Sequence, residues 1–200
     1  MALKFAVNNS LSAITSLPSS ISGGALNLIS TQTASASATI DFTSGIDSTY
    51  DSYVFKFINI HPSTSGDFSF QGDTGTNTNY NQTITSTCFE TYHEENDSDA
   101  GLGYRPTGDQ AQGTAFQRIS STIGTDNDNC CVGTLQIFNP SSNVFVKHFI
   151  ANCNGGYIDR YTDNHYVAGY FNTTTPLTRF RFKFVSGNID DGIIKMYGVS

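Results

Sequence analysis

The sequence is poor in charged residues and contains no tryptophan. Charged side chains make up 14% of its 200 residues, and 10 Lys and Arg stand against 17 Asp and Glu, which gives a net charge of −7 at pH 7. Because nucleic-acid binding depends on cations that neutralise phosphates, we expect no nucleic-acid partner. No apolar run approaches the roughly 20 residues of a membrane-spanning helix, so we expect no membrane insertion.

Catalytic and cofactor-binding motifs are also missing. The sequence has no nucleophile elbow of the G-x-S-x-G type and no Walker-type Gly-Lys-Ser, and Gly101–Pro106 lacks the last glycine of a dinucleotide fingerprint. His93–Asp97 lacks the second histidine of a zinc-protease helix. Asp126–Asn129 begins like a calcium loop, but Cys131 stands where that loop needs glycine. We therefore expect no enzyme, no cofactor and no metal site.

Cysteine and histidine are few and give no recognisable ligand spacing. The four cysteines are Cys88, Cys130, Cys131 and Cys153, without the C-x-x-C pairs of zinc sites. Neighbouring cysteines are poorly placed to bridge each other, so we expect free, partly buried thiols. The histidines His61, His148 and His165 could meet an Asp or Cys in the fold, and structural roles are favoured for them.

Aromatic residues are abundant, with 15 Phe and 10 Tyr, and they occur in strand-like alternation. In Arg179–Phe184 three phenylalanines alternate with three cations, which is typical of a half-buried strand whose charges face outward. Similar runs cover 38–43, 53–60, 67–71, 81–87, 132–138, 144–150, 165–171 and 193–197, and turn signals at 61–63, 72–75, 139–142, 153–156 and 190–192 separate them. This pattern predicts an all-β fold, an antiparallel, jelly-roll-like β-sandwich, over residues 25–200.

Residues 1–24 do not follow this alternation. Ser10 can cap a short helical segment that ends at Pro18, and Gly23-Gly24 separates the region from the strands. The apolar residues expected to make the attachment contacts are Leu11, Ile14, Leu17 and Ile21. One or two helical turns are not stable alone, so we predict an arm that attaches to the domain, a sister subunit or a larger assembly.

Two long polar stretches, Glu90–Gly113 and Ser120–Asn129, are predicted to be exposed loops, where binding sites tend to lie on rigid β scaffolds. The candidate recognition residues in them are Tyr92, His93, Tyr104, Arg105, Asp126 and Asp128. Tyrosine offers an apolar ring and a hydroxyl that suit protein or sugar contacts, and it suits the rim of a core equally well.

Several motifs resemble a family of small proteins encoded by marine phages, including cyanophages and pelagiphages. The matching stretches are Leu28–Thr33, Phe42–Tyr50, Ile58–Pro62, Phe138–Ser142, Val146–Phe149, Ala168–Thr173 and Ser186–Ile189, spread over most of the chain. Such proteins look like virion components, often tail-fibre-like. The resemblance implies a place on the particle and supplies no catalytic residues.

These observations predict a non-enzymatic structural protein on the surface of a virion, with a tail-fibre-like role in host recognition. The expected partners are further copies of the chain, as a homotrimer or another symmetric oligomer, other virion proteins, and a host surface glycan or receptor. One alternative is a capsid-decoration protein, of the cement or head-fibre kind. Another is a carbohydrate-binding or carbohydrate-active β-sandwich, whose carboxylate pair would be Glu90 with Glu94 or Asp159 with Asp163.

Overall fold

A computed structural model describes residues 26–157 and 160–200. These residues form twelve strands and no helix, in two antiparallel sheets, which confirms the predicted all-β sandwich. The strands are β1 (Asn27–Thr33), β2 (Ile40–Phe42), β3 (Ser52–Pro62), β4 (Phe68–Thr74), β5 (Ile84–Glu94), β6 (Ala100–Tyr104), β7 (Gln117–Arg118), β8 (Cys131–Phe138), β9 (Lys147–Tyr157), β10 (Tyr161–Phe171), β11 (Leu177–Phe184) and β12 (Ile189–Val199). The predicted arm, with Leu11, Ile14, Leu17 and Ile21, lies outside the described residues, as does Asp159.

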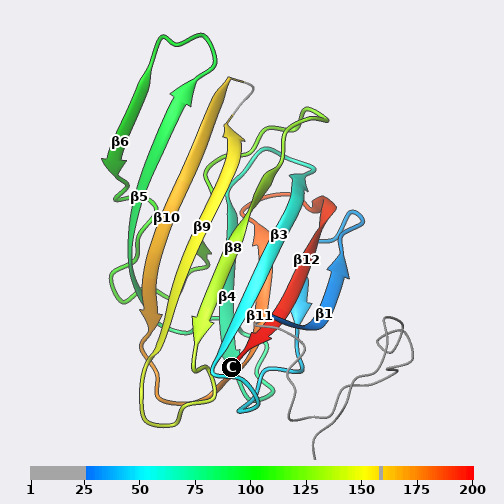
Figure 1. Ribbon diagram of the computed structural model, residues 1–200, viewed down its shortest axis with the longest axis vertical. Helices are drawn as coiled ribbons and strands as arrows, with labels where there is room; N and C mark the ends of the chain where they lie inside the picture. The colour runs from blue at the N-terminus through cyan, green and yellow to red at the C-terminus, as the bar shows by residue number, and fades with distance from the viewer. Residues whose placement is uncertain (1–25, 158–159) are drawn as a thin grey trace, which may run out of the picture.

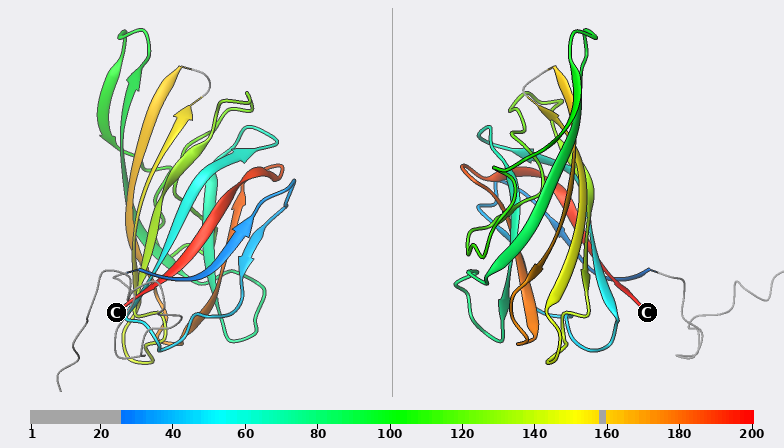
Figure 2. Two further views of the ribbon diagram at one scale, coloured as in Figure 1. Left: turned by 45° about the vertical axis from the view of Figure 1, so that its right-hand side comes forward. Right: turned by 90° about the vertical axis from the view of Figure 1, so that its left-hand side faces the viewer.

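The two sheets differ in width. The large sheet has eight strands in the order β1-β12-β3-β8-β9-β10-β5-β6, and the small sheet has four in the order β2-β11-β4-β7 (Figure 1). The chain changes sheet eight times, from β1 to β2, β2 to β3, β3 to β4, β4 to β5, β6 to β7, β7 to β8, β10 to β11 and β11 to β12. This is the winding of a jelly roll, and the β8–β9 hairpin with β1 and β12 widens its large sheet. Figure 2 shows the two layers from the side.

The core between the sheets is built largely from phenylalanine. The alternation predicted for β11 is confirmed, because Phe180, Phe182 and Phe184 are all buried. The ring centre of Phe182 lies 5.1 Å from that of Phe55 and 5.3 Å from that of Phe57, both on the large sheet. Tilted and edge-on aromatic pairs stabilise a fold beyond the area they bury, so these contacts join the two layers.

The cations on the opposite face of β11 point outward, as predicted, but each has a partner. Arg181 forms an ion pair with Asp41 through two contacts of 2.8 and 2.6 Å, and its guanidinium lies 4.1 Å from the ring centre of Tyr80. Arg179 donates a hydrogen bond to a backbone carbonyl, and Lys183 lies 5.2 Å from the centre of a phenylalanine ring. All three outward cations of β11 thus make contacts within the molecule.

The prediction of one exposed loop over Glu90–Gly113 is wrong for much of its length. Glu90–Glu94 completes β5 and Ala100–Tyr104 forms β6, and the two strands pair as a hairpin. Sequence reasoning failed here because the inward positions of β5 carry Glu90, Tyr92 and Glu94 instead of aliphatic residues, so the usual hydrophobic alternation is missing. Strands β1 and β7 were also not predicted.

Further loop and turn predictions need correction. The stretch Ser120–Asn129 is exposed only at 125–128, since its first part is buried and Ile123 forms an isolated bridge to Gly66. The turns predicted at Cys153–Gly156 and at Asp190–Gly192 lie inside β9 and β12. A Cβ atom at Gly155 would lie 2.5 Å from the Ile123 side chain, so glycine here permits close packing and does not mark a turn.

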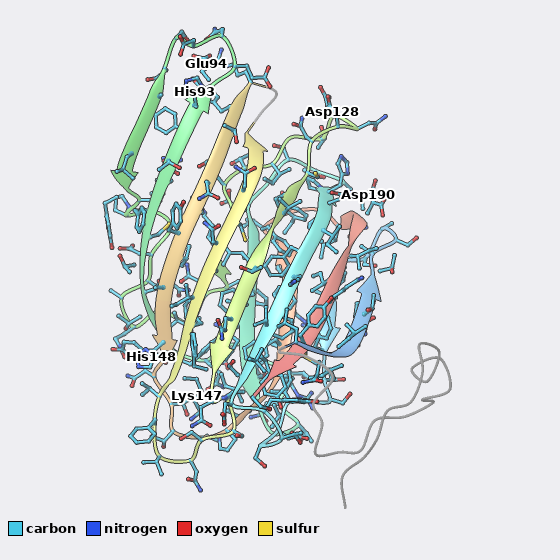
Figure 3. The ribbon with its side chains drawn as sticks, viewed as in Figure 1. His93, Glu94, Asp128, Lys147, His148 and Asp190 are labelled. Carbon is cyan, nitrogen blue, oxygen red and sulfur yellow. The ribbon has the colours of Figure 1, made fainter. Side chains whose placement is uncertain are left out.

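The strand register gives the molecule two distinct ends. Asn27, near the start of the described chain, pairs with Gly198, near its end, so both chain ends meet at one end of the large sheet. At the opposite end Tyr161 pairs with Glu94. We call the first the terminal end and the second the distal end. Figure 3 shows His93 and Glu94 at the distal end, and Lys147 and His148 at the terminal end.

Candidate functional site

The candidate site lies on β5 and β10 near the distal end of the large sheet. Figure 2 shows the β5–β6 hairpin rising beyond the small sheet, so the inward face of these strands is no longer covered by the phenylalanine core there. The inward residues change accordingly. On β10 they pass from the buried Phe171 and Val167 to His165 and Asp163, and on β5 from Ile84 and Cys88 to Glu90. This change from apolar to polar residues places titratable side chains at the edge of the core.

An open pocket of about 320 Å³ occupies this region. It is lined by Glu90, Tyr92, Asp99, Arg105, Arg160, Tyr161 and Asp163. The register of two rigid strands sets its geometry, because His165 lies directly opposite Glu90 and Asp163 opposite Tyr92. Side chains held in this way need little reordering when a ligand binds, which favours recognition.

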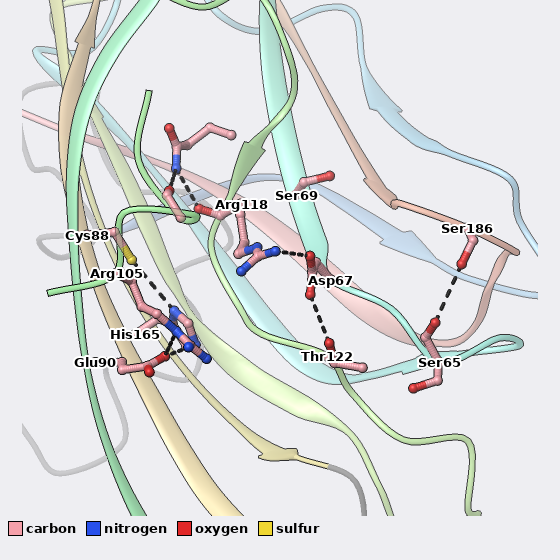
Figure 4. A network of polar contacts seen from close by, with 12 residues as sticks. Ser65, Asp67, Ser69, Cys88, Glu90, Arg105, Arg118, Thr122, His165 and Ser186 are labelled. Atoms are coloured by element: carbon pink, nitrogen blue, oxygen red, sulfur yellow. Dashed lines mark hydrogen bonds and ion pairs between the residues drawn. The ribbon is translucent and has the colours of Figure 1, made fainter. Parts of the chain in front are cut away.

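The buried carboxylates Glu90 and Asp163 line the pocket, and Figure 4 shows Glu90 beside Arg105, His165 and Cys88. The Nε2 atom of His165 lies 3.0 Å from Oδ2 of Asp163 and 3.4 Å from Oε2 of Glu90. The Nε atom of Arg105 lies 2.6 Å from the same Glu90 oxygen. The two groups form an ion pair, but their geometry does not make a hydrogen bond. On the other side of the imidazole, Nδ1 lies 3.7 Å from Sγ of Cys88.

Three atoms of this cluster are buried without a hydrogen bond: Oε2 of Glu90 and Nε of Arg105, which face each other as an ion pair, and Oδ1 of Asp163. Asp163 is 6% exposed, and its Oδ1 atom is buried without a hydrogen bond. Leaving a buried polar atom unpaired commonly costs about 1–3 kcal/mol, so such an atom calls for an explanation. Among the described residues, Glu90, Asp163 and His165 are the group whose ligand atoms could hold a metal ion, all within 4.8 Å of one another.

Two tyrosines form the wall of the pocket. The rings of Tyr92 and Tyr161 lie 5.9 Å apart in an edge-on arrangement, and the guanidinium of Arg160 lies 5.2 Å from the centre of the Tyr161 ring. Arg160 also forms an ion pair with Glu94 at 3.2 Å. The negative charge of Asp99 raises the pKa of the Tyr92 hydroxyl, which keeps it a neutral donor.

The residues predicted for recognition fall into separate places. Tyr92 and Arg105 line the pocket. His93 and Asp128 line a second, neighbouring pocket at the same end. Asp126 lies in the exposed loop, where its backbone carbonyl is 3.2 Å from Nε2 of His61. Tyr104 lies opposite Phe89 on the outward face of the large sheet, and its hydroxyl contacts Asp109.

The structure also brings together residues that the sequence had placed apart. Glu90 and Asp163 come from the two different carboxylate pairs considered for a carbohydrate-active protein, and they meet across His165. His165 is fully buried beside Cys88, Glu90 and Asp163. The sequence had suggested that this histidine could meet an Asp or Cys, but it did not show which residues these are. The i, i+2 spacing of Asp163 and His165 was the available signal, because it puts both side chains on one face of a strand.

All four cysteines are free, as predicted, and Cys88, Cys131 and Cys153 are buried. Burial raises the pKa of the Cys88 thiol to about 11, with a further contribution from the negative charge of Glu90. The thiol beside His165 is therefore protonated at neutral pH, and it is a poor nucleophile there.

Comparisons of this chain with protein-family models, with curated proteins and with solved structures found no match. Over the residues that the structure describes, there is no helix long and apolar enough to span a membrane.

Proposed function

We propose that this chain is a non-enzymatic protein of a phage particle surface, with a tail-fibre-like role, and that its β5–β10 pocket binds a saccharide on the host. The observation that carries the binding proposal is the pocket itself, with Tyr92 and Tyr161 beside the charged groups of Glu90 and Arg105. Aromatic rings pack on the apolar faces of sugar rings, and charged side chains pair with their hydroxyl groups. The phage setting is supported by the sequence resemblance.

The positions of the two ends fit this role. The pocket lies near the distal end, whereas the described chain starts and finishes at the terminal end. An attachment arm formed by residues 1–24 would thus join the domain on the side away from the pocket and leave the pocket facing outward. In a homotrimer or another symmetric oligomer, several weakly binding pockets would act together through avidity.

Binding is favoured over hydrolysis by the partners of the two carboxylates. A glycosidase needs one carboxylic acid that can donate a proton to the leaving group. Glu90 is instead engaged by the Arg105 guanidinium, and Asp163 by the His165 imidazole. Both residues are also more than nine-tenths buried, which limits the approach of a glycosidic bond.

Binding of purified protein to host cells and to a panel of immobilised oligosaccharides tests this proposal. Tyr92→Ala and Tyr161→Ala should each weaken binding at least about tenfold, since one lost aromatic contact at a binding centre commonly costs more than about 1.4 kcal/mol. Tyr104→Ala is the matched control, because Tyr104 lies on the outward face. If all three variants bound equally well, the pocket would not be the saccharide-binding site. If the protein released sugar on incubation, its activity would be hydrolysis and not binding alone.

A capsid-decoration role is the second candidate, and the outward face of the large sheet favours it. The outward positions of β8, β9 and β10 carry no Asp, Glu, Lys or Arg. Phe138 and Ile150 are exposed there, and Phe89 stacks on Tyr166 with ring centres 4.8 Å apart. Depletion of charge is typical of the centre of a protein interface.

Copy number per particle separates the two roles. Quantitative mass spectrometry should find few copies for a fibre-like protein and hundreds for a decoration protein that follows the capsid lattice. The same particles test the arm, because deletion of residues 1–24 should prevent incorporation, and normal incorporation of the truncated chain would contradict an attachment role.

A further inference from the structure

The cluster of Glu90, Asp163 and His165 has the composition of a metal site. Its two carboxylates and one imidazole nitrogen come from β5 and β10, and their ligand atoms lie within 4.8 Å of one another. All three residues are at least nine-tenths buried. Oδ1 of Asp163 has no hydrogen-bond partner although it is buried, and this is the independent sign that a ligand belongs here.

Charge balance points to a cation as that ligand. Among the described residues, Glu90 pairs with the Arg105 guanidinium, Asp163 pairs with no Arg or Lys, and Arg160 pairs with Glu94, so the cluster carries excess negative charge when His165 is neutral. Neutral imidazole is also the form that binds metals. The Cys88 thiol, 3.7 Å from Nδ1, occupies the second ring nitrogen, so that Nε2 faces the carboxylates. A partner on the second nitrogen is the usual way of orienting a metal-binding histidine.

We propose that Glu90, Asp163 and His165 bind a divalent transition-metal ion, with Zn²⁺ as the preferred ion. An imidazole nitrogen with two carboxylate oxygens suits zinc, whereas calcium and magnesium prefer oxygen ligands alone. Glu90 and Asp163 both line the open pocket, so an ion can enter from solvent. This site does not depend on saccharide binding.

Arg105 is the competing cation for this site. Its Nε atom lies 2.6 Å from Glu90 Oε2, and its side chain is 37% exposed, so it has room to turn into the pocket when an ion takes its place. If the guanidinium and the metal compete for Glu90, loss of the guanidinium raises the affinity for the metal. A purely structural ion-pair network does not produce this gain in affinity. Removing Arg105 should strengthen metal binding while it removes an ion pair.

Calorimetric titration of chelator-treated full-length protein with Zn²⁺ tests the proposal. We expect one equivalent to bind, and Asp163→Asn and His165→Gln each to weaken binding by more than about 100-fold, the upper range for loss of an outer-shell partner. Arg105→Met should bind more tightly than the wild type. His93→Gln is the matched control, because His93 and Asp97 form an exposed His–carboxylate pair on the same hairpin. Zn²⁺ binding that is lost in His93→Gln, or kept in both cluster variants, overturns the proposal.

A second measurement on the wild-type protein covers the case in which a cluster variant fails to fold. The chain has four histidines, and substoichiometric Mn²⁺ should selectively broaden the imidazole nuclear magnetic resonance signals of His165. Single His→Gln variants at the three other positions assign the signals. Absence of any broadening, or broadening confined to His61, His93 or His148, would show that the cluster holds no ion.

Discussion

Deprotonation of the buried thiol of Cys88 should destabilise the protein at alkaline pH. Burial raises the pKa of this thiol from 9.0 to about 11 in the folded state. An acid whose folded-state pKa is raised stabilises the fold while it is protonated, and this contribution is present in full below pH 9. As pH rises above 9, the unfolded chain loses its proton first, so the free energy of unfolding falls until about pH 11.

The size of the effect follows from the pKa shift. A difference of one pKa unit corresponds to about 1.4 kcal/mol, so a shift from 9.0 to about 11 gives a loss of about 1.4 kcal/mol by pH 10 and roughly 2 kcal/mol by pH 11. Cys88→Ala removes this titration and, through the lost packing of one atom, costs about 1 kcal/mol at pH 7. The wild type should therefore be the more stable protein at pH 7, and the two should become nearly equal near pH 10.

Urea unfolding at pH 7, 9 and 10, followed by circular dichroism with a reductant present, measures this difference. Val167→Ala is the control, because Val167 is a buried cross-strand neighbour of Cys88 that does not titrate. Its stability relative to the wild type should stay constant with pH. A constant difference for Cys88→Ala as well would refute the reasoning, since the thiol would then have an ordinary pKa in the fold.

Three further substitutions test the packing. Phe182→Ala should lower the free energy of unfolding by about 3–5 kcal/mol, because Phe182 is fully buried. Phe138→Ala should cost far less, because Phe138 is 36% exposed. Equal losses of stability in urea unfolding would contradict the assigned core. Gly169→Ala would place a Cβ atom 2.5 Å from a backbone carbonyl oxygen of β5 and should cost about 1–3 kcal/mol of stability. Gly103→Ala is the control, because a Cβ atom at Gly103 meets open space. Similar melting temperatures for the two variants would refute the close approach at Gly169. The ammonium of the fully buried Lys147 donates hydrogen bonds to two backbone carbonyls at 2.8 and 3.2 Å, so Lys147→Met should cost about 1–3 kcal/mol, and an unchanged thermal unfolding curve would show that these bonds add no stability.

The strands that sequence reasoning placed are those with apolar residues on one face. In β11 the alternation of Phe180, Phe182 and Phe184 with cations both located the strand and assigned its buried side. The distal half of β5 escaped prediction because its inward residues are polar, and Gly155 in β9 resembled a turn although it serves close packing. A local sequence pattern therefore reveals the buried face of a strand only where the residues on that face are apolar.

The sequence by itself determined the all-β class and the buried face of β11, because period-two alternation is a local property of the chain. The tertiary structure decided the site. Asp163 and His165 are neighbours along β10, but Glu90 and Arg105 reach them only through the pairing of β5 with β10 and with β6. Antiparallel pairing joins residues far apart in the chain, and no local pattern in the sequence sets which strand lies beside which.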